Sequence, residues 1–132
     1  MITQKLHQEF QSIDMNGTGW APPPGYPREI EEQILSGRLD EQKKIGSRTR
    51  LLRFRPGAYT SKPFVHDYWE EVYLISGELT VRGAEGSEES ATFAANTYAC
   101  RPPGILHGPF RSEKGCLLLE FHYYEPSASL NP

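Results

Sequence analysis

The sequence predicts an all-β domain, a barrel or sandwich built from seven or eight short strands. Turn-forming residues are frequent, with 12 glycines and 11 prolines among 132 residues. Short apolar or alternating runs lie between these turns, which is typical of strands and unlike the long periodic segments of helical bundles. The chain is long enough for one hydrophobic core and short for two, so we expect a single domain.

Residues 1–27 are predicted to form an N-terminal arm. Within it, the segment GWAPPPGYP (residues 19–27) is rich in proline, which lacks the backbone N–H donor and fixes φ, so it cannot form a central strand. We expect Trp20 and Tyr26 to anchor the arm on the barrel. Residues 28–37, REIEEQILSG, fit either a short helix or a strand. We favour a strand, because the polar segment RLDEQKKIGSR would then connect two paired strands.

The strand pattern strengthens from Thr49 onward. Leu52 and Phe54 alternate with arginines, which predicts a strand with one buried face. The polar segment GAEGSEES (residues 83–90) is predicted to be a hairpin tip. Further strands are predicted over residues 72–75, 78–82, 93–100 and 115–125, so the barrel domain spans residues 28–126, and a tail of residues 127–132 follows it.

Three side chains suited to a divalent metal stand beside the ends of predicted strands. His66 closes one segment, Glu70 opens the next, and His107 follows the Pro-x-Gly turn of RPPGILHGPF. Neutral imidazole and carboxylate suit Zn, Fe, Mn or Ni, and two histidines with one carboxylate is the pattern of non-haem iron sites. A lone histidine four residues before a glutamate is usually a surface ion pair. The common placement of all three residues favours a metal site instead.

The spacing of these residues resembles that of the cupin motifs. The first motif corresponds to Gly57, the FVH of residues 64–66, Glu70 and Gly77, and the second to PPGILH of residues 102–107. The segments GWAPPPGYP, TRLLRFRPGA and EKGCLLLEF are further similar to cupins of the ChrR anti-sigma-factor type. Acetylacetone-cleaving and dihydroxyacetophenone-cleaving dioxygenases are related small cupins. The resemblance covers about residues 49–123 and implies a cupin jelly-roll barrel, a double antiparallel β-sheet that encloses a pocket.

The resemblance also implies which residues bind a metal. His66, Glu70 and His107 would hold one divalent ion: iron in an enzyme, with Zn, Mn or Ni as alternatives. Phe64 stands where cupins commonly have a further histidine, so it would leave a coordination position open and form an apolar wall. His122 is a candidate fourth ligand or partner of the ligands; the alternative is a surface or interface histidine. The remaining candidates are Val72, Leu74, Tyr98 and Cys100 as pocket-lining residues, and Tyr68 and Trp69 at the mouth of the barrel.

The resemblance leaves three classes of function open. The first is a non-haem dioxygenase that cleaves a carbon–carbon bond in a small carbonyl or phenolic compound, with Glu70 as a ligand or, alternatively, as a base. The second is a non-catalytic metal-sensing or ligand-sensing module of ChrR type. The third is a metal-assisted isomerase or hydrolase of a small sugar or acyl compound. No basic cluster stands at the two motifs, which disfavours phosphosugars.

Charge and hydropathy limit the partners of the chain. The net charge is −3 without a basic cluster, so nucleic acid is not an expected partner. The sequence has no apolar run of about 18 residues and no signal-peptide pattern, so we expect a cytoplasmic protein with Cys100 and Cys116 as free thiols. We expect a small-molecule ligand and a homodimer in which the proline-rich arm covers edge strands of the neighbour.

Overall fold

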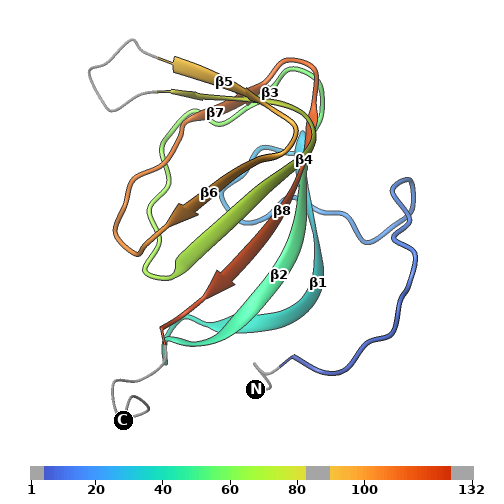
Figure 1. Cartoon of the computed structure of the whole chain (residues 1–132), viewed down its shortest axis with the longest axis vertical. Helices are drawn as coiled ribbons and strands as arrows, with labels where there is room; N and C mark the ends of the chain where they lie inside the picture. The colour runs from blue at the N-terminus through green and yellow to red at the C-terminus, as the bar shows by residue number, and fades with distance from the viewer. Residues whose placement is uncertain (1–4, 83–89, 126–132) are drawn as a thin grey trace.

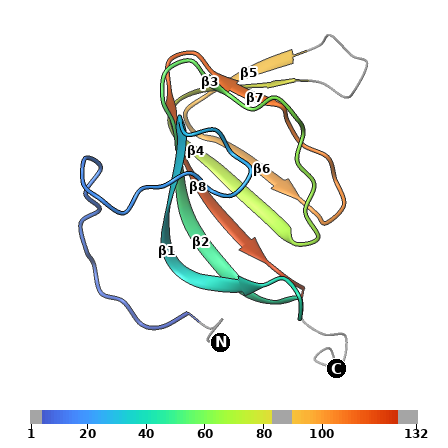
Figure 2. The ribbon, with the colours of Figure 1, turned by 180° about the vertical axis from the view of Figure 1, so that it is seen from behind.

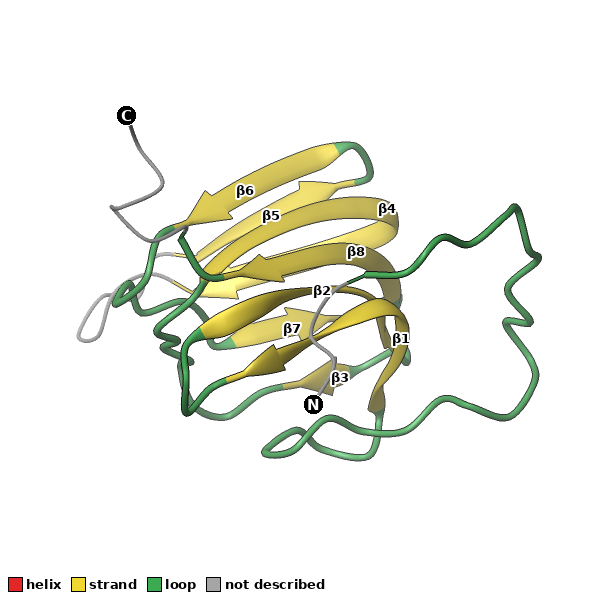
Figure 3. Ribbon diagram, turned by 90° about the horizontal axis from the view of Figure 1, so that it is seen from below, coloured by secondary structure: helices red, strands yellow, loops and turns green. Residues whose placement is uncertain are grey.

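The protein folds as an antiparallel β-sheet that curls on itself into a half barrel (Figures 1 and 3). This computed structural model describes residues 5–82 and 90–125, in which eight strands and no helix occur. The all-β prediction is therefore confirmed. The described residues also contain no helix that could cross a membrane. In chain order the strands are β1 (Ile30–Asp40), β2 (Ile45–Phe54), β3 (Ala58–Tyr59), β4 (Trp69–Arg82), β5 (Ser90–Ala94), β6 (Thr97–Arg101), β7 (Phe110–Ser112) and β8 (Cys116–Tyr123).

Strand β4 connects the two halves of the sheet. The strands follow the order β1-β2-β8-β4-β7-β3, and β5 and β6 also pair with β4. The first part of β4, from Trp69 to Gly77, pairs with β8 and β6, whereas the part from Glu78 to Arg82 pairs with β5 and β7. The register of the β4–β8 pair shifts between Leu74 and Ser76. This irregularity and the bend beside it let a single strand serve both halves.

The concave face of the sheet is apolar at one end and charged at the other. Strands β2, β4 and β8 each send alternate residues inward. Towards one end these residues form the hydrophobic core, with Leu52, Phe54, Val72, Leu74 and Leu118 among its members. Towards the other end the same faces carry Arg50, Glu70, Glu120 and His122, all of them buried. The core thus supports a buried polar cluster on the same three strands.

The strand interpretation of residues 28–37 is confirmed, because β1 runs from Ile30 to Asp40 and pairs with β2. The connection between them is shorter than predicted, a turn over residues 41–44, because Arg38 and Arg48 lie within the strands rather than in a loop. The single strand predicted over residues 93–100 is wrong. The structure divides it into β5 and β6 with a turn at Asn96, whose φ of 70° ends the first strand.

The predicted arm contacts the barrel through its two aromatic residues. The Trp20 ring lies 3.9 Å from the guanidinium carbon of Arg53, and the Tyr26 ring stacks on Phe64 with a centroid distance of 4.7 Å. Ala21 also forms an isolated bridge with Glu32 on the free edge of β1. Figure 2 shows the segment that leads into β1 passing across the curled sheet, where Tyr26 packs against the core. The strands span residues 30–123, inside the domain limits expected from the sequence, and those limits themselves stay predictions.

Two predicted segments, a hairpin tip and the C-terminal tail, lie wholly or largely outside the described residues. The hairpin tip predicted over residues 83–90 lies outside the described residues except for Ser90, which begins β5. The tail of residues 127–132 lies outside them entirely.

The bend of β4 depends on Gly77, and we predict that Gly77→Ala destabilises the protein more than a matched glycine substitution. Gly77 has a φ of 82°, and an added Cβ would meet the Gly115 carbonyl oxygen at 2.0 Å. Gly57 has a similar φ of 86° with nothing within 4 Å of an added Cβ. Strain alone should cost Gly57→Ala about 1 kcal/mol, and overpacking should add roughly 1–3 kcal/mol in Gly77→Ala. Denaturant unfolding of both variants measures the difference, and equal losses would contradict the assignment.

Candidate metal centre

Two chain segments meet where the predicted ligands lie. Phe64 and His107 form an isolated antiparallel bridge, in which the Phe64 N–H donates to the His107 carbonyl at 2.7 Å and the His107 N–H donates back at 2.9 Å. This bridge sets His66 and His107 beside Glu70, the second residue of β4. His107 Nε2 lies 3.5 Å from Glu70 Oε1, and His66 Nε2 lies 3.9 Å from Glu70 Oε2. One nitrogen or oxygen from each of the three residues lies within 4.8 Å of the others.

The protonation of the two imidazoles fits a metal site. His107 Nδ1 lies 3.2 Å from the carbonyl oxygen of Ile105, which can only accept, so Nδ1 carries the hydrogen and the lone pair of Nε2 faces Glu70. His66 Nε2 is buried and has no hydrogen-bond partner among the described residues. Burial lowers the pKa of His66 to about 4 and also lowers the pKa of His107, so both rings are neutral at pH 7. Neutral imidazole is the form that binds metals, and an unpartnered buried nitrogen indicates a place for one.

His122 uses both of its ring nitrogens within the protein. Arg48 Nε donates to His122 Nδ1 at 3.1 Å, and an arginine has no acceptor, so Nδ1 must be unprotonated. His122 Nε2 therefore carries the hydrogen and donates it to Glu70 Oε2 at 2.9 Å. The side chain is fully buried, unlike the surface or interface histidine considered above. In this arrangement His122 orients Glu70, as histidine and carboxylate partners of metal ligands commonly do.

A second group of possible ligands, Glu70, Glu120 and His122, also meets within 4.8 Å. Its free donor capacity is small, because Arg50 holds Glu120. Arg50 Nε donates to Glu120 Oε1 at 2.8 Å, and Arg50 Nη1 donates to Glu32 Oε1 at the same distance. Burial alone would raise the pKa of Glu120, but the adjacent Arg50 guanidinium holds it well below its usual range. Glu120 is thus an ion-paired carboxylate, and the set of His66, Glu70 and His107 is the better metal site.

No family model matches the chain, and no curated protein matches it. Solved structures do match it along most of its length. An RmlC-like cupin from Shewanella frigidimarina NCIMB 400 aligns at a TM-score of 0.66 and 17% identity, covering 96% of this chain and 97% of that chain. An acetylacetone dioxygenase from Acinetobacter johnsonii aligns at 0.61 and 21%, covering 96% and 81%. The polyketide cyclase RemF from Streptomyces resistomycificus aligns at 0.66 and 15%, covering 89% and 81%. The chain has the cupin fold.

Phe64, where the sequence has no histidine at the motif position, lies beside the two histidines of the candidate metal site. Its ring centroid is 6.3 Å from those of both His66 and His107. It forms an apolar wall next to the candidate metal site, and Tyr26 stacks on it.

Tyr68 and Trp69 lie elsewhere than at the mouth of the cupin barrel. Tyr68 is buried, and its ring stacks on His66 with a centroid distance of 4.5 Å and an interplanar angle of 8°. This stacking supports the orientation of the His66 imidazole. Trp69 stacks on Tyr123 and donates from Nε1 to Glu125 at 2.8 Å, so it belongs to the outer surface.

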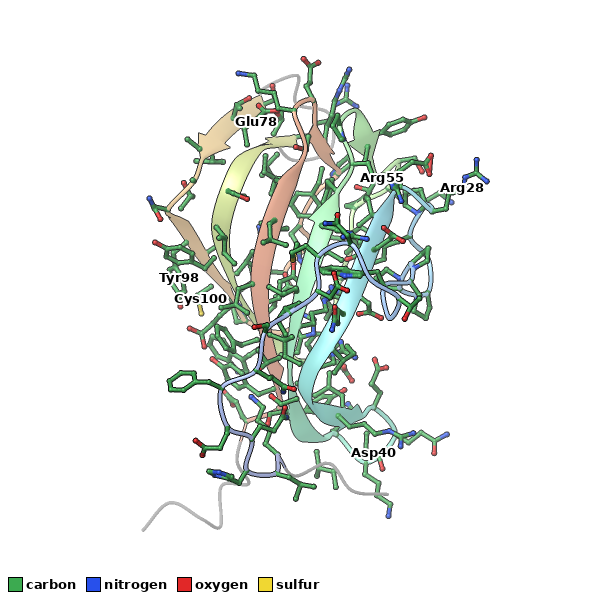
Figure 4. The ribbon with its side chains drawn as sticks, turned by 90° about the vertical axis from the view of Figure 1, so that its right-hand side faces the viewer. Arg28, Asp40, Arg55, Glu78, Tyr98 and Cys100 are labelled. Carbon is green, nitrogen blue, oxygen red and sulfur yellow. The ribbon has the colours of Figure 1, made fainter. Side chains whose placement is uncertain are left out.

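The predicted pocket-lining residues differ in burial according to the strand face on which they lie. Val72 and Leu74 are buried in the core, and Val72 lines the cavity that also contains Glu70 and His107. Tyr98 and Cys100 lie exposed at the outer edge of β6 (Figure 4), where the Tyr98 hydroxyl donates to Glu71, although Tyr98 also lines a cavity with Val72 and Leu74. They pair with Tyr73 and Glu71, which are outward-facing residues of β4. The intervening Ala99 and Arg101 are the residues of β6 that face inward.

Sequence reasoning missed the three charged residues that surround Glu70 and its partners. Arg101 Nη1 donates to Glu70 Oε1 at 3.2 Å, and Arg50 and Glu120 form the adjacent buried ion pair. The sequence did indicate that Arg50 faces the interior, because two-residue spacing puts it on the same strand face as Leu52 and Phe54, which were predicted to be buried. No such signal existed for Arg101, whose face depends on how β6 pairs with β4.

We predict that the His66 ring stays neutral down to about pH 4 in the metal-free protein. Burial disfavours the charged imidazolium and lowers the pKa of His66 from 6.5 to about 4. The unfolded chain then binds this proton at higher pH than the folded chain does. The free energy of unfolding should therefore fall as the pH drops from about 6.5 towards 4. Ring-nitrogen chemical shifts of ¹⁵N-labelled histidine measure the midpoint, and a His66 midpoint near 6.5 would contradict the buried geometry.

Proposed function

We propose that this cupin is a metal-dependent dioxygenase that cleaves a carbon–carbon bond in a small carbonyl or phenolic compound. The observation that carries the proposal is a set of two histidines and one carboxylate with an apolar side chain, Phe64, at the position of a further ligand. Two histidines and one carboxylate with open positions is the ligand set of non-haem iron oxygenases. The similarity in fold to an acetylacetone dioxygenase supports the same class of chemistry. Iron(II) is the proposed metal, with Zn, Mn or Ni as alternatives.

The residues of the chain have separate roles in this proposal. His66, Glu70 and His107 hold the metal, which when bound supplies a Lewis acid and the redox chemistry that dioxygen requires. His122 and Arg101 both donate to Glu70 and hold it as a carboxylate, which favours its role as a ligand over a role as a base. Burial raises the pKa of Tyr26, which therefore presents a neutral hydroxyl to the cavity that contains Glu70 and His107. Phe64 limits access of water to the ligands from its side.

The proposal predicts one divalent metal per chain that depends on His107. His107→Ala removes a ligand and should abolish stoichiometric metal binding. His7→Ala changes an exposed residue of the arm and should have no effect. Elemental analysis of protein purified without a nickel column measures both, with circular dichroism to confirm the fold. Equal metal content in the two variants would contradict the ligand set.

The catalytic part of the proposal is tested by oxygen consumption. Iron-loaded protein should consume dioxygen in the presence of at least one member of a panel of β-diketones and hydroxyaryl ketones. His107→Ala should lower the rate by at least about 100-fold if the metal is lost. Stoichiometric iron without oxygen consumption across the panel would reject the dioxygenase and favour a non-catalytic sensing module.

Phe64 provides a second prediction, because it replaces a potential ligand. Phe64→His should tighten metal binding roughly tenfold or more, since imidazole is a good ligand for all the metals considered. It should also lower any activity that requires the open position. Phe64→Leu keeps an apolar wall without adding a ligand and should leave metal affinity unchanged. Competition with a chelator measures the affinities. Unchanged affinity in Phe64→His together with a lower melting temperature would mean that Phe64 only packs the interior.

We further propose a homodimer formed through the outer face of the sheet. Exposed apolar side chains gather there on neighbouring strands, with Tyr73 and Ile75 on β4 and Phe121 on β8, and Phe10 of the arm is fully exposed. A surface of this kind is typical of association sites. Light scattering at micromolar concentration should give twice the monomer mass of 15.0 kDa. A monomer mass would reject the dimer.

A further inference from the structure

Arg101 lies at the junction of two cavities. One contains Glu70 and His107 of the candidate metal centre together with Tyr26 and Phe110. The other has a volume of about 280 Å³ and is lined mainly by apolar side chains, among them Leu74, Val81 and Phe93. Arg101, Val72, Leu79 and Leu118 line both cavities, so the two share one wall. A molecule in the apolar cavity would therefore contact Arg101, which also lines the cavity that contains Glu70 and His107.

The guanidinium of Arg101 has donor capacity to spare, in contrast to that of Arg50. Arg50 is held by Glu32 and Glu120, and its side chain is 5% exposed. Arg101 makes one side-chain hydrogen bond among the described residues, from Nη1 to Glu70 Oε1 at 3.2 Å, and its side chain is 18% exposed. Because a guanidinium has five N–H donors, most of those of Arg101 remain for a ligand. Phe110 lies beneath it, 5.6 Å from its guanidinium carbon, and limits its movement.

The charges around the site favour an anionic ligand once a metal is bound. Three arginines face three glutamates in this cluster, half of them buried and half of them partly exposed, so the charged residues balance while the histidines are neutral. A divalent cation then adds two positive charges that the protein does not offset. Because unpaired charge is costly in a buried site, a negatively charged ligand group would be stabilised there. The residues counted are Arg48, Arg50 and Arg101, and Glu32, Glu70 and Glu120.

We infer that Arg101 determines substrate specificity by binding the anionic end of the substrate, an enolate or carboxylate, while the apolar remainder occupies the 280 Å³ cavity. This inference deepens the proposed function and rests on it. It identifies the substrate class as an apolar organic anion with its negative end directed towards the ligand set. Guanidinium and carboxylate form charge-assisted hydrogen bonds that a neutral group cannot reproduce.

The test uses cinnamate and its neutral analogue cinnamamide, which share an apolar body and differ in charge. Isothermal titration calorimetry of the full chain as purified should show cinnamate binding about ten- to hundredfold more tightly than cinnamamide. Arg101→Gln keeps an N–H that can reach Glu70 but removes the charge, and it should reduce this ratio to about one. Arg101→Lys keeps the charge without the fork of donors and should give an intermediate ratio. Arg111→Gln, at an exposed arginine of β7, is the matched control and should keep the wild-type ratio.

The same titrations in the presence of EDTA distinguish the effect of Arg101 on ligand binding from the effect of the metal. A preference for cinnamate that depends on Arg101 should persist with EDTA, although weakened by the loss of the metal charge. The inference is overturned by any of three results: no preference in the wild type, a preference unchanged in Arg101→Gln, or a preference that EDTA abolishes. If Arg101→Gln does not fold, as judged by circular dichroism, Arg101→Lys decides by the same criterion. Absence of metal and of oxygen consumption with the Arg101-dependent preference intact would reject the dioxygenase alone.

Discussion

The carboxylate of Glu70 is the group on which the charged half of this barrel depends. It is 4% exposed, and an ionised carboxylate at that depth is stable only when hydrogen bonds and opposite charges compensate for its lost hydration. His122 and Arg101 provide that compensation from β8 and β6, the two strands that pair with the first part of β4. The neutral imidazoles of His66 and His107 also lie close to this carboxylate, with Nε2 atoms 3.9 Å and 3.5 Å from its oxygens. A divalent cation between these groups would bind the imidazole nitrogens and the carboxylate together, and would leave the cluster with a net positive charge.

The two ends of the concave face have different roles, one in stability and the other in the candidate metal centre. Burial of the apolar end of the concave face is the main stabilising contribution, at about 25 cal/mol for each Å² removed from water. That contribution permits the other end to hold a cluster of ionised side chains, whose net effect on stability is small or unfavourable. Such clusters are retained where they hold functional groups in place. The hydrogen-bonded series Arg48, His122 and Glu70 belongs to such a cluster. Arg48 fixes the protonation of His122, and His122 in turn orients Glu70.

Local sequence was sufficient for the fold and for the grouping of His66, Glu70 and His107, but not for the environment of the candidate site. The motif spacing identified the cupin barrel, and the structure brings His66, Glu70 and His107 together as that spacing implied. The last strand was difficult to orient, because the face with Leu117, Leu119, Phe121 and Tyr123 is the more apolar one. The structure turns the face with Glu120 and His122 inward, since β2 places Arg50 and Arg48 directly opposite them. That register joins residues 70 and 74 positions apart, so no pattern within one strand could reveal it. The same limit explains why Cys100 was assigned to the pocket, whereas Tyr98 does line the apolar cavity.

The most direct test of the central claim is to locate a metal in the protein. Crystals grown with iron(II) under anaerobic conditions should give an anomalous peak at the iron absorption edge between His66 Nε2, His107 Nε2 and the Glu70 carboxylate. Coordination distances should be near 2.0–2.2 Å, as for comparable nitrogen and oxygen ligands. His122 should remain hydrogen-bonded to Arg48 and Glu70 outside the coordination sphere. A peak among Glu70, Glu120 and His122, or a coordinated His122 that has lost its contact with Arg48, would contradict the account.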